Sequence, residues 1–274
     1  MPALQSGDHI GGFRILRKIR AGGASTVYLA VGGRDNTEVA LKVMHPELAG
    51  ERGRRREFDN EARVTKRLDH PNIIRLLRYM RSASPPYFIM EFFPGRNLKV
   101  ETVRNRDFVL ENLQGILLQA AEAMAYMHGE NIVHVDMKPE NLLVDDDARV
   151  KMIDFALART VNVGFLARLG KQAVRGTRHY MSPEQIRGQP LDPRSDIYSL
   201  GATIYDICVG RPPFTGVDVN EILHRHLYEK PIPMREAGAE VPYRLDRLVL
   251  QMLAKEADER PQSMMVVRRA LERI

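Results

Sequence analysis

The sequence has one cysteine and no tryptophan among its 274 residues. A single cysteine excludes an intramolecular disulfide, so the folded state must rest on buried apolar side chains. Cys208 stands in an apolar stretch, which favours a buried packing residue over a reactive thiol. This sparing use of cysteine is typical of proteins in reducing compartments, and we expect a cytoplasmic location.

Long hydrophobic runs are absent as well. No segment reaches the roughly 18 uninterrupted apolar residues that a membrane-spanning helix requires. The best candidate, residues 197–209, is short and contains Asp206. Residues 1–10 do not show a basic stretch followed by an apolar one, so no signal peptide is expected. We therefore expect no membrane segment in this chain.

Neither sign of charge dominates. The chain has 41 Lys and Arg against 35 Asp and Glu, which gives a formal net charge of +6. Basic residues cluster within residues 14–20 and 52–56, but aromatic residues are not interleaved with them. Surfaces that bind single-stranded nucleic acid usually combine the two. We interpret the clusters as solvated faces and expect no nucleic-acid partner.

The order of the expected elements divides the chain into two parts. Period-two alternation and glycine punctuation predict strands within residues 10–45, 73–80 and 87–93. Composition and helical periodicity predict helices at residues 52–69, 110–128, 195–209 and 243–255. A strand-rich first third followed by a helix-rich remainder predicts an α+β fold, and Pro94-Gly95 is the expected hinge between two lobes.

The strand-rich part contains residue types that could hold phosphates. Residues 19–27 (IRAGGASTV) form a glycine-rich turn between two expected strands, where small residues would let the backbone lie over phosphates. By itself, a glycine-rich hairpin turn is more often a structural feature. Lys42 ends an expected strand, and Glu61 follows 19 residues later on an expected helix. An ion pair between them would hold the lysine against the α- and β-phosphates of a nucleotide.

The helix-rich part contains the stronger signal. Residues 134–141 (HVDMKPEN) place an acid, a lysine and an asparagine at fixed offsets before an apolar strand at residues 142–144. Asp136 could accept the proton of an attacking hydroxyl, Lys138 could neutralise charge on a γ-phosphate, and Asn141 could ligate a metal. Asp154 follows a further apolar stretch, and its natural role is to bridge magnesium ions that bind phosphates.

These motifs together resemble the eukaryotic-like (Hanks-type) serine/threonine protein kinases of bacteria. The resemblance runs from about Phe13 to Leu271. It includes three further segments: residues 176–184 (GTRHYMSPE), residues 195–201 (SDIYSLG) and Arg260-Pro261. It implies a two-lobed fold, with an antiparallel sheet and one main helix over residues 1–93 and a larger, mostly helical lobe over residues 94–274.

The resemblance also implies an activity. It implies transfer of the γ-phosphoryl group of ATP to serine or threonine hydroxyls of protein substrates, with Mg²⁺ and with Mn²⁺ as the alternative metal. Lys138 and Thr177 match the serine/threonine branch of the family. The alternative is an ATP-binding pseudokinase or scaffold, but such a protein would more typically lack Lys42, Asp136 or Asp154.

The family pattern assigns roles to single positions. Expected catalytic residues are Asp136, Lys138, Lys42 and Glu61, and the expected metal ligands are Asn141 and Asp154. Expected ATP-binding residues are Ile19, Gly22, Gly23, Val27, Ala40, Lys42, Met90, Glu91, Phe93 and Leu143. Within this set Met90 matches the gatekeeper, and Glu91 and Phe93 match the hinge positions. Four further residues match the family pattern. Asn97 matches a ribose-contacting region, and the other residues are expected to support the structure: Glu184, Arg260 and Asp196.

The chain departs from the family pattern at five positions. Arg20 and Ser25 stand where the phosphate loop usually has its first and third glycines. Val135 replaces the arginine that normally receives a phosphorylated activation loop. Ala156 replaces a glycine after Asp154-Phe155, which is expected to restrict movement of that aspartate. Thr65 stands where an aliphatic side chain is usual.

The segment between Asp154 and Glu184 has few hydroxyl groups. They belong to Thr160, Thr177, Tyr180 and Ser182. Because Val135 removes the usual receiver of a phosphate, we hypothesise that phosphorylation of this segment does not activate the protein.

Overall fold

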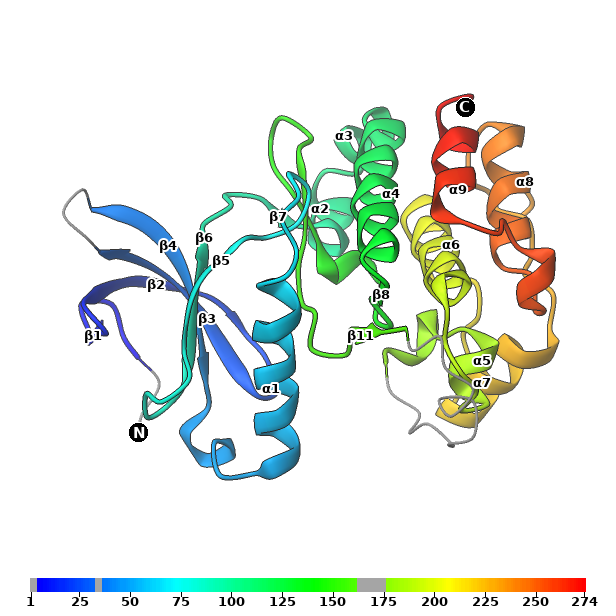
Figure 1. Cartoon of the computed structure of the whole chain (residues 1–274). Coiled ribbons are helices and arrows are strands. Elements are labelled where there is room, and N and C mark those ends of the chain that lie inside the picture. The colour runs from blue at the N-terminus through cyan, green and yellow to red at the C-terminus, as the bar shows by residue number, and fades with distance from the viewer. Residues whose placement is uncertain (1–3, 33–35, 162–175) are drawn as a thin grey trace. The chain divides into compact units, whose positions relative to one another are not determined.

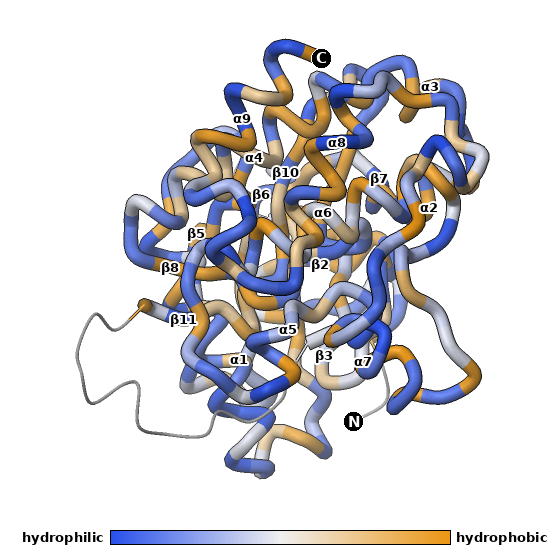
Figure 2. The backbone as a smooth tube through the Cα atoms, turned by 90° about the vertical axis from the view of Figure 1, so that its right-hand side faces the viewer, coloured by the Kyte–Doolittle hydropathy of each residue, from blue (hydrophilic) through white to orange (hydrophobic). Residues whose placement is uncertain are grey.

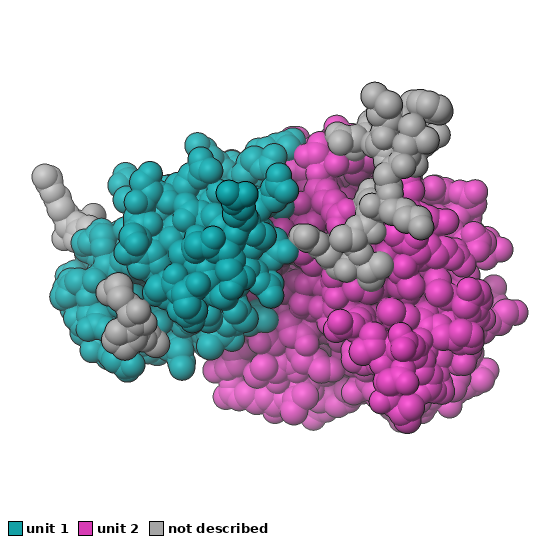
Figure 3. All heavy atoms as spheres, turned by 90° about the horizontal axis from the view of Figure 1, so that it is seen from below, with its two compact units in different colours: residues 1–94 teal, residues 95–274 magenta. Residues whose placement is uncertain are grey.

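The computed structural model describes residues 4–32, 36–161 and 176–274. The chain forms two compact units, Met1–Pro94 (unit 1) and Gly95–Ile274 (unit 2), which are coloured separately in Figure 3. Within the described residues, no helix is both long enough and apolar enough to cross a membrane.

Unit 1 is built on an antiparallel sheet. Its strands are β1 (His9–Ile10), β2 (Phe13–Ala21), β3 (Ser25–Gly32), β4 (Thr37–Met44), β5 (Leu76–Met80) and β6 (Tyr87–Glu91). They follow the order β1-β2-β3-β4-β6-β5. One face is apolar because alternate residues such as Ile15, Leu41 and Ile89 point into a common buried cluster.

The helix α1 (Arg52–Thr65) packs on unit 1's sheet, as Figure 1 shows. Phe58 and Ala62 on the helix are buried against Met44 and Phe88 on the strands. The helix ends at Thr65, earlier than the predicted residue 69, and the chain turns at residues 66–67. Pro71 disfavours the helical conformation at His70, so the helix could not extend past this point.

Unit 2 is mostly helical. Its longer helices are α2 (Leu98–Arg104), α3 (Arg106–Glu111), α4 (Leu113–Gly129), α6 (Pro193–Val209), α7 (Val219–Tyr228), α8 (Tyr243–Met252) and α9 (Met264–Leu271), and α5 (Pro183–Ile186) is short. α6 is buried along nearly all of its length and forms the centre of the unit. Hydrophilic and hydrophobic residues alternate along α8 in Figure 2, because one side of this helix packs on α6.

Short strands in unit 2 frame the loops of the candidate site. β9 (Leu142–Val144) pairs with β10 (Val150–Met152) and with β7 (Arg96–Asn97). β8 (Ile132–Val133) pairs with β11 (Arg159–Thr160). Residues 134–141 and 153–158 connect these strand pairs and are therefore held beside each other.

Several element boundaries differ from the predicted ones. The strand predicted from residue 73 begins at Leu76. Ile73 forms only an isolated bridge, and Ile74 is buried outside any strand, so apolar character there does not extend the strand. The helix predicted at residues 110–128 is divided between α3 and α4 at Asn112. The Asn112 side chain donates to the Phe108 carbonyl at 2.9 Å, which competes with regular helix hydrogen bonding.

Candidate active site

The residues expected at the site divide between the two units. Unit 1 carries Ile19, Gly22, Gly23, Val27, Ala40, Lys42, Glu61, Met90, Glu91 and Phe93, and unit 2 carries Asp136, Lys138, Asn141, Leu143 and Asp154. Each group of residues has a definite arrangement within its own unit.

Strand register gathers the unit 1 residues on one face of the sheet. Val27 on β3 lies opposite Lys42 on β4, and Ala40 on β4 lies opposite Met90 on β6. Directly opposed residues point to the same face, and so do residues two apart along a strand. Val27, Ala40, Lys42 and Met90 therefore share the face on which α1 also packs.

Lys42 and Glu61 form the predicted contact. The Lys42 Nζ lies 2.6 Å from each carboxylate oxygen of Glu61. Their side chains are only 14% and 6% exposed, so the pair is shielded from water. A shielded bidentate pair fixes the lysine side chain far better than an exposed ion pair would. The departure at Thr65 is tolerated because its buried hydroxyl donates to the Glu61 carbonyl at 2.8 Å.

The glycine-rich turn forms a tight hairpin between β2 and β3. The Gly22 N–H donates to the Ser25 carbonyl at 2.9 Å. Ser25 is buried and lies opposite Met44, so its side chain belongs to the strand. Ile19 falls at a register shift between Lys18 and Arg20, and 41% of it is exposed.

Glu91, an expected ATP-binding residue, and Asn97, which matches a ribose-contacting region, already make contacts within their own units. The Glu91 N–H donates to the Arg75 carbonyl at 3.0 Å, and the Glu91 carboxylate accepts from the Arg75 N–H at 2.8 Å. The Asn97 side chain accepts from the Val100 N–H at 2.9 Å and caps the N-terminus of α2. The side chains of Glu91 and Asn97 therefore stabilise local structure in addition to their expected roles.

In unit 2, Asp196 organises the loop that follows β8. Its carboxylate accepts from the backbone N–H groups of His134 and Val135 at 2.8 and 2.9 Å, and lies 2.9 Å from the Nε2 atom of His128. Burial alone would raise the pKa of Asp196, but the His128 contact and the backbone N–H groups hold this pKa below its ordinary value. A charged Asp196 thus clamps the start of the loop.

Asp136 lies at the centre of a hydrogen-bonded triangle. The Lys138 Nζ is 2.6 Å from one Asp136 oxygen, and the Thr177 hydroxyl donates to the other at 2.9 Å. The Thr177 N–H also donates to Asp136 at 2.8 Å, and Lys138 donates to the Thr177 hydroxyl at 2.6 Å. The carboxylate is therefore held in one orientation beside a fixed cation.

Asn141 and Asp154 are presented by the β9–β10 hairpin. Asn141 directly precedes β9, Asp154 follows β10, and the Ile153 N–H donates to the Asn141 carbonyl at 2.9 Å. The Asn141 Nδ2 donates to the Asp136 carbonyl at 2.8 Å, which orients the amide.

The donor set at this hairpin suits a hard cation. The Asn141 Oδ1 is buried and has no hydrogen-bond partner among the described residues. Buried polar atoms normally have a hydrogen-bond partner, so this amide oxygen is available for a ligand. Mg²⁺ prefers oxygen ligands, and the Asn141 amide and the Asp154 carboxylate, on joined segments, are of that kind. The described residues contain no group of three or more His, Cys, Asp or Glu side chains arranged for a metal. A cation here would therefore need further ligands from phosphate or water.

Backbone strain lies at two positions of the loops. Val135 has a φ of 73° and Asp154 a φ of 67°, both in the left-handed region. This region is costly for a β-branched residue, and the cost is offset because the Val135 N–H and carbonyl are both bonded, the latter to Gln185 at 2.8 Å. Ala156 does not have a positive φ. The substitution of glycine by alanine is therefore compatible with the observed conformation.

The short helix α5 and the segment before it are tied to the rest of unit 2. Glu184 forms two contacts with Arg260, at 2.8 and 3.0 Å, and the side chain of Arg260 is fully buried. Burial would raise the pKa of Glu184, but Arg260 holds this pKa below its ordinary value. The Tyr180 hydroxyl donates to Asp206 at 2.7 Å, and Asp206 also pairs with Lys99.

Some residues of the site were not assigned these contacts from the sequence. Thr177 was singled out only as a marker of the serine/threonine branch, and its contacts with Asp136 span 41 positions. His128 and Gln185, which fix Asp196 and Val135, were not predicted to contribute. No short-range pattern connects these residues, so only the tertiary structure could bring them together.

Comparison with known proteins identifies the family of the chain. The family model described as "Protein kinase domain" matches residues 13–271, the extent expected from the motifs. The chain is 34% identical over 253 residues to a "Probable serine/threonine-protein kinase PknB" of Corynebacterium glutamicum, covering 89% of this chain and 39% of that protein. It is also 34% identical over 257 residues to "Serine/threonine-protein kinase PknB" of Mycolicibacterium smegmatis, covering 92% and 41%.

A third relative is "Serine/threonine-protein kinase pkn2" of Myxococcus xanthus, which is 34% identical over 261 residues, covering 92% of this chain and 31% of that protein. The chain thus spans about two fifths or less of the length of these relatives. The predicted α+β fold, with an antiparallel sheet followed by a helical remainder, is confirmed. The match over residues 13–271 shows that the chain belongs to the protein kinase family.

Proposed function

We propose that this chain is a serine/threonine protein kinase that transfers the γ-phosphoryl group of ATP to protein hydroxyls. The observation that carries the proposal is the contact of Asp136 with both Lys138 and Thr177 at 2.6 to 2.9 Å. Phosphoryl transfer needs a positioned acceptor for the hydroxyl proton and nearby positive charge, and little covalent chemistry.

In this proposal, Asp136 accepts the proton of the attacking serine or threonine hydroxyl. Its orientation is set before the substrate arrives, because Thr177 and Lys138 hold both carboxylate oxygens. Lys138 supplies positive charge for the transferring phosphoryl group. Positioning of this kind lowers the entropic part of the barrier.

We assign phosphate binding in unit 1 to the Lys42–Glu61 pair. The carboxylate holds the Lys42 ammonium group at 2.6 Å, so the cation is available in one place for the α- and β-phosphates of ATP. Val27, Ala40 and Met90, on the same face of the sheet, are the proposed apolar contacts of the adenine ring, together with Ile19 and Leu143. Gly22, Gly23, Glu91 and Phe93 complete the proposed ATP-binding set.

We assign metal binding to Asn141 and Asp154, with Mg²⁺ as the preferred ion and Mn²⁺ as the alternative. A bound divalent ion would neutralise phosphate charge during transfer. Asn141 and Asp154 would hold it through oxygen atoms.

The test is a phosphotransfer assay with radiolabelled ATP, Mg²⁺ and a generic protein acceptor, beside Asp136→Asn. The variant should lose activity by a factor of about 100 or more, because general base catalysis contributes at least that much. Phosphoamino-acid analysis should find label on serine or threonine only. Equal signal from both proteins would end the catalytic proposal, and ATP binding without transfer would identify a pseudokinase.

A further inference from the structure

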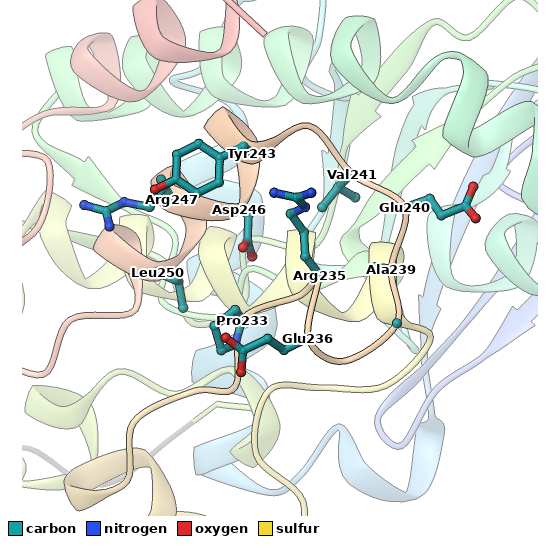
Figure 4. Close-up of a pocket in the computed structure, with 11 residues that line it drawn as sticks. Pro233, Arg235, Glu236, Ala239, Glu240, Val241, Tyr243, Asp246, Arg247 and Leu250 are labelled. Carbon is teal, nitrogen blue, oxygen red and sulfur yellow. The ribbon is translucent and has the colours of Figure 1, made fainter.

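A groove in unit 2 contains none of the residues assigned to phosphotransfer. It lies between residues 233–241 and the helix α8, has a volume of about 830 Å³, and is drawn in Figure 4. Its lining includes Pro233, Arg235, Tyr243 and Arg247. A second cavity, of about 530 Å³, shares Tyr243 and Arg247 and adds Arg244 and Arg273. The two cavities adjoin at these shared residues, and we call the surface that they line the arginine groove.

The arrangement on α8 concentrates positive charge. Arg244 and Arg247 are three residues apart and Tyr243 and Arg247 four apart, so all three side chains occupy one side of the helix. The guanidinium carbon of Arg235 lies 5.9 Å from the centre of the Tyr243 ring. In Figure 4 this ring lies between the guanidinium groups of Arg235 and Arg247.

These arginines differ from several other arginines of unit 2, which are paired. Arg194, Arg225, Arg260 and Arg268 each pair with a carboxylate. In the described parts of the chain, Arg235, Arg244 and Arg247 have no carboxylate within ion-pair distance. Arg244 is instead held by a hydrogen bond from its Nη1 to the Arg273 carbonyl at 3.0 Å. The groove thus presents guanidinium groups that form no ion pair with a carboxylate of the described residues.

The start of α8 would also favour an anion. The N-terminus of a helix carries partial positive charge. In α8 the cationic side chains of Arg244 and Arg247 lie near this end and add to that charge, and Pro242 provides no side-chain cap. The one acidic residue of the first turn, Asp246, is buried and accepts from the Met234 N–H at 2.7 Å. A bound anion would therefore satisfy both the arginines and the helix end.

The chemistry of the groove suits a phosphorylated peptide. Guanidinium groups bind phosphate oxygens in pairs, and clustered arginines are a recurrent means of phosphopeptide recognition. Val241 and Leu250 add apolar lining for the flanking side chains of a peptide. Glu236 and Glu240 also line the groove, and Glu240 points away from Tyr243 in Figure 4. A uniformly anionic membrane surface would face these carboxylates, whereas a peptide can place its phosphate on the arginines alone.

We propose that the arginine groove binds protein segments that carry phosphoserine or phosphothreonine. The idea rests on the proposed function in one respect: the kinase would itself produce such segments. A groove that retains them would hold a phosphorylated substrate while further hydroxyls of the same substrate react. The expected consequence is faster modification of acceptors that are already phosphorylated.

The test measures binding of a fluorescein-labelled glycine–alanine peptide with two phosphoserines to the complete 274-residue chain by fluorescence anisotropy. The same peptide with unmodified serines should bind about tenfold more weakly or worse, because charge-assisted hydrogen bonds are lost. Arg244→Ala combined with Arg247→Ala should weaken phosphopeptide binding by a similar factor. Arg247→Lys should weaken it less, since charge is kept and paired hydrogen bonding is lost.

Controls separate this site from general charge effects and from the active site. Arg14→Ala removes an exposed arginine on β2 and should leave binding unchanged. Asp136→Asn should abolish phosphotransfer and leave binding intact, so the two proposals can fail independently. Equal loss in Arg14→Ala, displacement of the peptide by ATP, or tighter arginine-dependent binding to phosphatidylserine vesicles would each overturn the proposal.

Discussion

At the scale of single residues, Thr177 joins two segments of the candidate site. Its hydroxyl donates to Asp136 and accepts from Lys138, and its N–H gives Asp136 a second bond. The hydroxyl suits this position because its single oxygen accepts from the ammonium group and donates to the carboxylate at once. This double contact explains why the side chain at this position should affect rate more than stability.

We predict that Thr177→Val lowers the rate of phosphotransfer by a factor of about 10 to 100, through misplacement of Asp136 and Lys138. Thr177→Ser should keep most of the rate because it retains the hydroxyl. Single-turnover assays at saturating ATP measure the effect, and urea unfolding should show little change. If Thr177→Val were as fast as the parent protein, the triangle would have no role in positioning Asp136.

Asp196 allows a second prediction at this scale, on stability. Asp196→Asn replaces an oxygen acceptor by an N–H₂ donor that would face a backbone N–H or His128. Loss of this buried charge should cost about 3 kcal/mol in the free energy of unfolding. Asp146→Asn is the matched control, because the Asp146 side chain is 98% exposed and its loss should cost less than about 0.5 kcal/mol.

The Asp196 effect should depend on pH. The folded pKa of Asp196 lies below its ordinary value of 3.8, so its stabilisation is fully present above that value and is lost as pH falls through the folded pKa. The difference in urea midpoint between the parent chain and Asp196→Asn should therefore be largest near neutral pH and shrink in acid. A difference that grew on acidification would contradict the assignment of a charged, hydrogen-bonded carboxylate.

At the scale of elements, the contact between α6 and α8 depends on a glycine. A Cβ atom added at Gly201 on α6 would lie 2.8 Å from the Cβ of Met252 on α8. The two helices can approach this closely only because residue 201 has no side chain. The position also supports the arginine groove, since α8 carries Tyr243, Arg244 and Arg247.

We predict that Gly201→Ala destabilises the protein by about 1 to 3 kcal/mol, the usual cost of overpacking a core. Gly115→Ala is the matched control, since Gly115 lies in α4 and an added Cβ would meet nothing within 4 Å. This second change should stabilise the helix by about 0.5 to 1 kcal/mol. Thermal unfolding of both variants gives the comparison, and destabilisation of equal size in both would rule out the packing explanation.

At the scale of the whole molecule, the question is how activity would be controlled. Thr177, Tyr180 and Ser182, which lie between Asp154 and Glu184, have hydroxyls with structural contacts: Thr177 with Asp136, Tyr180 with Asp206, and Ser182 as the buried cap of α5. Thr160 is exposed on β11. Val135 occupies the position of the missing phosphate receiver and is buried. Residues 162–175, part of the same segment, lie outside the described residues and contain no serine, threonine or tyrosine.

We predict that phosphorylation within this segment does not activate the protein. Phosphatase-treated protein should phosphorylate a generic acceptor as fast as untreated protein, and Thr160→Ala should behave like the parent chain. Mass spectrometry would establish the occupancy of Thr160 before each assay. A large gain in rate on stoichiometric phosphorylation of Thr160, lost in Thr160→Ala, would disprove the prediction.

Much of the fold followed from local patterns. The strands of unit 1 and the helices α6 and α8 were expected because period-two and helical spacing of apolar residues is a local property. Boundaries were less predictable where side chains intervene, as at Asn112, or where a buried apolar residue lies outside any strand, as at Ile74. These differences arise from hydrogen bonds and burial that a single-residue pattern does not contain.

The sequence by itself determined which chemical groups are present and their order, because residues 134–141 hold the acid, lysine and asparagine in one short loop. The tertiary structure alone decided how they are oriented. Thr177, Gln185 and Asp196 reach the loop across 41, 50 and more positions, through contacts that depend on packing around α6. The tertiary structure also decided that the arginines within residues 235–247 lie near Tyr243 without a carboxylate partner among the described residues. The spacing of charged residues in the sequence does not predict which of them form ion pairs in the fold.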